Sequence, residues 1–128
     1  MSHHVIMFQP RFAPLVESGK KLTTIRGARK RAIKAGDTLS LREWTGKPYR
    51  SKQRELRTAV VTAVDKIEML EGGMFPWSFT VYQNGYELNC AARILFSSVD
   101  GFSGVNDMAR WFKDTHGLPF TGVRISWS

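Results

Sequence analysis

The apolar residues of this chain occur in short segments separated by basic or glycine-containing stretches, which limits each helix or strand to a few residues. The clearest segment, Thr38–Trp44, alternates apolar and polar residues with period two, as a half-buried strand does. Within residues 79–88, Asn84-Gly85 lies between β-prone flanks, which predicts a hairpin with a tight turn. No segment approaches the roughly 18 apolar residues that a membrane-spanning helix needs.

The remaining segments complete a strand-rich pattern. Four more segments have the composition of strands, namely residues 4–8, 23–26, 56–64 and 123–127. Two segments have helical spacing of apolar residues: one covers 10–19, and the other starts near Ser103 as N-cap and stops at His116-Gly117. About six strands and two helices predict an α+β fold, with a curved sheet or small β-barrel and two flanking helices. The length of 128 residues fits a single domain, 1–128.

Positive charge is concentrated in the first half of the chain. Residues 1–57 hold 14 Lys and Arg and four acidic residues, a net charge of +10, whereas residues 58–128 carry a net charge of −2. This distribution predicts an anionic partner, nucleic acid or a nucleotide first, with a merely soluble basic surface as the alternative. The basic residues gather in two predicted loops, 29–34 and 47–54, and the second loop places Tyr49 among its cations, as in single-strand binders.

Several catalytic chemistries lack their sequence signatures. One cysteine and three histidines cannot supply the ligands of a zinc deaminase, so we expect no metal and no organic cofactor. Glycine-rich phosphate-binding motifs and the Gly-x-Ser-x-Gly elbow are absent. A single cysteine and no pattern of a secretory leader indicate a cytoplasmic protein without a membrane partner. Cys90 as a nucleophile with His116 has no local support, and the alternative is a buried, inert thiol.

Lys21 and Thr24 are the candidates for a reactive pair. A lysine serves as general base for a hydroxyl when burial or nearby cations depress its pKa. If Ile25 faces the core, period two places Thr24 and Arg26 together on the opposite face of a strand. Lys21 reaches that side only if the chain turns after Gly19. The alternatives are a solvated lysine beyond a helix end and an ordinary strand threonine.

The segment Gly19–Arg26 follows a short predicted helix and precedes Gly36-Asp37 and a strand. This order resembles the ASCH family, whose pattern is a helix, Gly-x-Lys-x-x-Thr-x-Arg, and then Gly-Asp before the next strand. Asp100-Gly101-Phe102 ahead of the second predicted helix, and the closing strand, also fit, so the resemblance spans nearly the whole chain. ASCH domains are similar to PUA domains, which implies a small β-barrel with a cleft for RNA or nucleosides.

Within that family, the chain looks most similar to the small bacterial amidohydrolases that cleave N4-acetylcytidine. Their catalytic Lys and Thr match Lys21 and Thr24, and their catalytic Glu falls where this chain has Asp100, whose arm is one methylene shorter. The resemblance implies that Thr24 attacks the acyl carbonyl, that neutral Lys21 takes its proton, and that Asp100 orients Lys21 or assists proton delivery to the N4 amine. The substrate is then a modified cytidine nucleoside or base.

Other residues are assigned to substrate binding by the same resemblance. Arg26 is expected to bind the base carbonyl or a carboxylate product, and Arg11 a ribose or phosphate. Stacking on the base falls to Phe8, Trp44 or Trp77, with core packing as the alternative. Compared with the smallest members, residues 65–99 contain an insertion that could widen or cover the pocket with Trp77, Phe79 and Tyr82. The alternative function is an RNA-binding PUA-like module or a ribonuclease that uses the basic loops.

Overall fold

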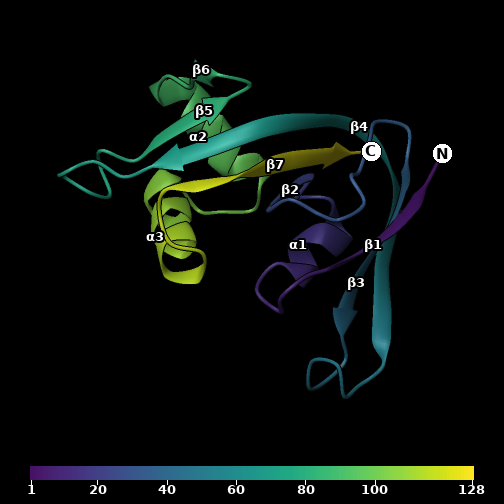
Figure 1. Cartoon of the computed structure of the whole chain (residues 1–128). Coiled ribbons are helices and arrows are strands. Elements are labelled where there is room, and N and C mark those ends of the chain that lie inside the picture. Colours follow the sequence, from purple (N-terminus) through teal and green to yellow (C-terminus); the bar gives the residue numbers. More distant parts are fainter.

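Seven strands form one sheet, and three helices pack around it, in a computed structural model that describes all 128 residues (Figure 1). The strands are β1 (His3–Met7), β2 (Thr23–Arg26), β3 (Thr38–Trp44), β4 (Gln53–Leu70), β5 (Thr80–Gln83), β6 (Tyr86–Glu87) and β7 (Phe120–Trp127). The helices are α1 (Ala13–Ser18), α2 (Cys90–Val99) and α3 (Val105–Thr115). The predicted α+β class is therefore confirmed.

β4 is the strand on which both parts of the sheet are assembled. Its first half pairs antiparallel with β3, and β3 pairs parallel with β1. Its second half pairs antiparallel with β7 and β5, to which β2 and β6 are added. The register with β7 shifts between Val61 and Ala63, and such irregularities bend a strand. Figure 1 shows β4 as one long curved ribbon that passes from β3 to β7.

The sheet does not close into a barrel. β1 pairs only with β3, and β2 pairs only with β7, so no backbone ladder joins β1 to β2. The structure therefore lacks the small β-barrel that was predicted beside a curved sheet as the alternative, and it has seven strands and three helices where about six and two were expected. Because β1 and β2 leave two strand edges unjoined, the contacts across this gap involve side chains rather than a backbone ladder.

Several predicted elements are confirmed, and others needed the tertiary structure. The strands 23–26 and 38–44 have the predicted bounds, and Asn84-Gly85 forms the hairpin turn between β5 and β6 with both residues at positive φ. The strand predicted at 56–64 is longer at both ends, because its first half pairs with β3 and its second half pairs with β7. Helix α3 has Gly104 rather than Ser103 as its N-cap.

Helix α2 was missing from the sequence-based prediction. Its N-cap, Asn89, accepts a hydrogen bond from the Ala92 amide at 2.9 Å, a capping signal that directly follows the hairpin. Apolar periodicity did not reveal the helix, since Ile94 and Leu95 point outward and are exposed while Phe96 is buried. None of the three helices has the length and apolar character required to cross a bilayer.

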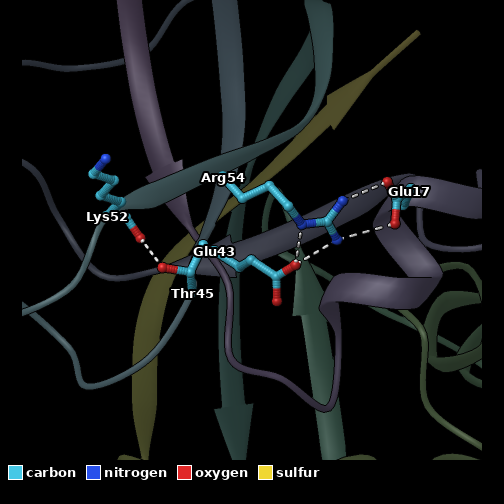
Figure 2. A network of polar contacts seen from close by, with 5 residues as sticks. All are labelled: Glu17, Glu43, Thr45, Lys52 and Arg54. Atoms are coloured by element: carbon cyan, nitrogen blue, oxygen red, sulfur yellow. Dashed lines mark hydrogen bonds and ion pairs between the residues drawn. The ribbon is translucent and has the colours of Figure 1, made fainter.

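Helix α1 is attached to the sheet by its buried residues and by one arginine. Val16 is fully buried in the core cluster, whereas Glu17 faces outward. The Arg54 guanidinium donates to both carboxylate oxygens of Glu17, at 2.9 and 3.1 Å, and its Nε donates to Glu43 at 2.9 Å (Figure 2). This pairing holds the pKa of Glu17 below its ordinary value. The network therefore fixes the orientation of α1 rather than contributing much stability, because exposed ion pairs are weak.

Gly36-Asp37 has a structural role. The buried Asp37 carboxylate accepts hydrogen bonds from the Ser2 amide at 3.0 Å, His4 Nε2 at 2.9 Å and the Lys34 amide at 3.0 Å. These bonds hold the pKa of Asp37 well below its ordinary value. The carboxylate therefore ties the start of β1 to the turn that precedes β3.

Replacing Asp37 with Asn should lower the thermal unfolding midpoint, and the loss should depend on pH. Because the folded-state pKa lies below the ordinary value of 3.8, the carboxylate stabilises the fold above that pH and loses this effect as the pH falls further. The midpoints of the parent and Asp37→Asn should therefore differ most near neutral pH and converge in acid. Asp114→Asn, an exposed aspartate with no ion pair, is the control. Equal losses in the two variants would contradict the structural role of Asp37.

Candidate functional site

A cleft of about 160 Å³ opens between the unjoined strands β1 and β2 and is bounded by α3. Its reactive side chains are Lys21, Thr24, Arg26 and Asp100. The cleft is otherwise mainly aromatic, and this wall is made by Phe8, Phe12, Phe102, Trp111, Phe112 and His116. Five of the six residues predicted for the site therefore line one cleft, although they come from positions 8 to 100 of the sequence.

Lys21 enters the cleft because the chain turns sharply after α1. Gly19 adopts a left-handed conformation with φ of 81°, as a residue after a helix end commonly does, and the Lys21 amide then donates to the Leu15 carbonyl at 3.0 Å. The Lys21 side chain is only 3% exposed. Its Nζ donates to the backbone carbonyl of Asp100 at 2.6 Å. This turn is the one that the sequence required for Lys21 to share a face with Thr24.

Asp100 is placed by the end of α2, of which it is the C-cap, and not directly by the start of the next helix as predicted. Its carboxylate accepts a hydrogen bond from Thr23 Oγ1 at 2.7 Å and lies 3.4 Å from Lys21 Nζ. Gly101 follows with φ of +93°, and a Cβ at that position would lie 3.2 Å from Lys21 Cδ. A glycine there lets Lys21 pass close to the backbone that carries the carboxylate.

Burial governs the charge state of this pair. Burial lowers the pKa of Lys21, and the positive charges of Arg26 and Arg11 lower it further against the opposing effect of Asp100. Burial raises the pKa of Asp100, against the effects of Lys21, Thr23 and Arg124. Both pKa shifts make the neutral form of each group more favourable than it is in water. Lys21 thus has the lowered pKa that a lysine requires to act as a general base.

Thr24 and Arg26 project together from β2, as the alternation predicted, while Ile25 is buried in the core. Arg26 Nε donates to Thr24 Oγ1 at 3.0 Å, and its terminal nitrogen donates to the Met7 carbonyl on β1 at 2.8 Å. Burial lowers the pKa of Arg26 to about 10, so it remains a cation at neutral pH. The structure contains no direct hydrogen bond between Lys21 and Thr24; the two side chains share the cleft.

The other predicted binding residues have different positions. Arg11 does not line the cleft: it forms an ion pair with Asp107 on α3, and its guanidinium lies 5.1 Å from the ring centre of Phe102. Phe8 lines the cleft but is only 4% exposed, and the Arg26 guanidinium lies 5.0 Å from its ring centre. Since the cation occupies this face, Phe8 serves better as a support for Arg26 than as a stacking platform.

Neither tryptophan that was predicted as a stacking alternative lies in the cleft. Trp44 packs against Tyr49 in the β3–β4 hairpin, with ring centres 5.2 Å apart, and Trp77 is exposed elsewhere. The expectation that residues 65–99 widen or cover the pocket finds no support, since Phe79 is buried in the core and Tyr82 lies on β5.

Helix α3 contributes cleft residues that the sequence reasoning assigned to the core or to the helix end. Trp111 is half-buried and offers the most accessible large aromatic surface of the cleft wall. His116 stacks on Phe112 with ring centres 5.5 Å apart, and burial followed by the charge of Arg26 lowers its pKa. In the sequence, the only signal for a role of Trp111 and His116 in the cleft was their position, five residues apart, at the end of an amphipathic helix.

The structure does not bring together the residues of a Cys90–His116 catalytic pair or of a metal site. Cys90 is exposed rather than buried, lies outside the cleft and contacts Arg93 rather than His116. No three His, Cys, Asp or Glu side chains are grouped as metal ligands would be. Comparisons with protein-family models, curated proteins and solved structures found no match for this chain.

Lys21→Met should destabilise the protein in a pH-dependent manner. Losing one partner of a buried ion pair costs roughly 3 to 5 kcal/mol of unfolding free energy, because Asp100 is left buried without its cation. Burial raises the pKa of Asp100 in the folded state, so this cost should grow as the pH rises above the ordinary range of an aspartate and shrink in acid. Denaturant unfolding at pH 5 and pH 8 measures the effect.

The double variant Lys21→Met/Asp100→Asn supplies the matched control. Removing the carboxylate charge should recover part of the lost stability and abolish the added pH dependence. If the single variant lost the same stability at both pH values, Asp100 would not be carrying the uncompensated charge.

Proposed function

We propose that this chain is an amidohydrolase that removes the acyl group from N4-acylated cytosine or cytidine, of the N4-acetylcytidine type, and that it is an ASCH protein related to PUA-like domains. The observation that carries the proposal is the buried lysine, Lys21, held beside Asp100 in the cleft that also contains the Thr24 hydroxyl. A buried lysine base beside a hydroxyl is an arrangement used for acyl transfer. The exposed free thiol of Cys90 suits the reducing cytoplasm that we propose as the location.

In the proposed reaction, Thr24 is the nucleophile and Lys21 the base. The hydrogen bond from Arg26 Nε to Thr24 Oγ1 stabilises negative charge on that oxygen. The Oγ1 proton passes to neutral Lys21 as the oxygen bonds to the acyl carbon. The C–N4 bond then breaks, and N4 receives the proton from Lys21. A water molecule then gives a proton to neutral Lys21 as its oxygen bonds to the acyl carbon. The ester bond to Thr24 Oγ1 breaks, Oγ1 receives this proton from Lys21, and the acyl group leaves as a carboxylic acid that ionises in water.

Asp100 acts in this scheme as a positioning residue. It holds Lys21 through its backbone carbonyl, at 2.6 Å, and through the nearby carboxylate. The carboxylate is itself held by Thr23. Because a backbone carbonyl makes the shorter contact, the short arm of Asp is sufficient to keep Lys21 directed into the cleft.

Trp111 is the residue that we propose for contact with the planar base. It is half-buried at the cleft wall, and an aromatic face of this kind stacks on any nucleobase. Arg26 is the donor for the carbonyl of the base or the acyl group, since it is a cation inside the cleft. No organic cofactor or metal enters the scheme.

A second candidate function is RNA binding or cleavage. It is favoured by the loop 29–34, in which the four basic residues are exposed and none forms an ion pair: Arg29, Lys30, Arg31 and Lys34. Binding of this kind should weaken steeply with salt, by about one unit of log–log slope for each phosphate contact. By contrast, hydrolysis of a neutral nucleoside depends little on salt.

Incubation with N4-acetylcytidine should yield cytidine and acetate, measured by chromatography. Thr24→Ala and Lys21→Ala should lower kcat/KM by about a thousandfold or more, since loss of a nucleophile or its base costs several orders of magnitude. Thr121→Ala, on an exposed position of β7, is the matched control and should retain activity. A chelator should leave the rate unchanged.

Two results would count against the assignment. Near-parental activity of a folded Thr24→Ala protein would remove Thr24 from the role of nucleophile. Tight, salt-sensitive RNA binding without hydrolysis of any N4-acylcytidine would favour the second candidate function instead.

The pH dependence of kcat/KM tests the role of Asp100. Activity should rise with pH through the pKa of Lys21, which burial lowers from 10.5. The Asp100 charge raises the pKa of Lys21, so Asp100→Asn should move this limb to lower pH while lowering the plateau rate by about a hundredfold. Asp100→Glu should restore the limb toward its parental position. An unshifted limb in Asp100→Asn would show that the carboxylate does not act on the base.

A further inference from the structure

A second cavity, of about 370 Å³, lies across β2 from the cleft. Successive residues of a strand point to opposite faces, and accordingly Thr24 lines the cleft while Thr23 lines the second cavity. The cavity is bounded by α2 on one side and by β2, β5 and β7 on the other, and Figure 1 shows α2 beside β5 and β7. It is therefore distinct from the site of the proposed hydrolysis.

Apart from Thr23, which donates to Asp100, the polar side chains of this cavity lack hydrogen-bond partners in the protein. Gln83, Arg124 and Ser126 line it, and none of their side chains makes a hydrogen bond. Arg124 is the only charged residue in the lining, and its Nε is buried without a partner. A terminal nitrogen of Arg124 forms a loose ion pair with Asp65, at 3.8 Å and without a hydrogen bond, and the guanidinium lies 4.9 Å from the ring centre of Phe96. Donors from two strands thus remain free beside one cavity.

The rest of the lining is apolar. Leu22, Leu88, Leu95 and Val99 form much of the wall, and Leu22 and Leu95 are exposed at its rim. Small-molecule sites combine such a wall with a few convergent polar groups. A single guanidinium with amide and hydroxyl neighbours matches one carboxylate, whereas a phosphate would call for more cations. The ligand therefore needs one carboxylate and an apolar body.

We propose that this cavity binds a small monocarboxylate with an apolar tail, the carboxylate on Arg124 and the tail against Leu95 of α2 and Leu22, which directly precedes β2. The proposal does not rest on the proposed hydrolase activity, because it involves different side chains. The two sites nevertheless touch through Thr23, whose side chain lines this cavity and donates to Asp100.

Hexanoate is a suitable probe, observed by ¹H–¹⁵N correlation spectra of the full chain. Hexanoate should shift the signals of Gln83, Arg124 and α2 with a dissociation constant below about 1 mM, a modest affinity for eight non-hydrogen atoms. 1-Hexanol, which lacks the charge, and hexylamine, which reverses it, should bind at least about tenfold more weakly, because neither satisfies the guanidinium.

Arg124→Gln should weaken hexanoate binding at least about tenfold and leave 1-hexanol binding unchanged. Arg110→Gln, at an exposed arginine of α3, is the matched control and should bind as the parent does. Leu95→Asp changes an exposed position that is 65% accessible, so it should fold while weakening both ligands. This second variant keeps the test decisive if Arg124→Gln does not fold.

Three outcomes would overturn the proposal: no shift of the cavity signals at 10 mM hexanoate (roughly tenfold above the expected constant), equal binding by Arg124→Gln, or shifts confined to Arg26 and Trp111. The last outcome would place hexanoate in the cleft, as a mimic of the carboxylate product, and would leave the proposed hydrolase standing. Loss of the hydrolase assignment, in turn, would not change the hexanoate result.

Discussion

Arg26 bridges two strands that do not pair, and the candidate site depends on that bridge. A backbone ladder between β1 and β2 would fill the space that the cleft now occupies, whereas the Arg26 side chain reaches the Met7 carbonyl and leaves the cleft open. Burying this cation requires compensation, which two hydrogen bonds and the ring of Phe8 supply. The same guanidinium then orients the Thr24 hydroxyl and adds to the field that lowers the pKa of Lys21.

Burying the Lys21–Asp100 pair costs desolvation free energy, because both charged groups are removed from water. Buried ion pairs seldom stabilise proteins more than apolar residues of similar size would, so their presence in a cleft is better explained by chemistry than by stability. Three features position Lys21 beside Asp100: the turn at Gly19, the close approach at Gly101 and the hydrogen bond from Thr23. Because these features come from segments about 80 residues apart, the pair also couples the end of α2 to the start of β2.

The sequence predicted those parts of the site that depend on local geometry. Alternation along β2 was enough to place Thr24 and Arg26 on one face, and the glycine after α1 was enough to bring Lys21 to that face. Long-range pairing could not be predicted in this way: Arg11 is occupied by Asp107, 96 residues later, and only the tertiary structure reveals it. Trp111 has the same periodicity as a core residue, so its accessibility depends on a gap between strands that no local pattern encodes.

Adjacent residues of β2 line different cavities, so this one strand separates the two proposed sites and also connects them. Thr23 and Thr24 point in opposite directions, yet the Thr23 hydroxyl donates a hydrogen bond to the Asp100 carboxylate, which raises the pKa of Lys21 against the lowering effect of burial. Arg124, which lines the second cavity, also lowers the pKa of Asp100, against the raising effect of burial. An anion bound to Arg124 would offset part of that positive field and favour the protonated form of Asp100. Occupation of the second cavity would thereby weaken the opposing effect of Asp100 on Lys21 and make the lysine a weaker base that is neutral over a wider range of pH.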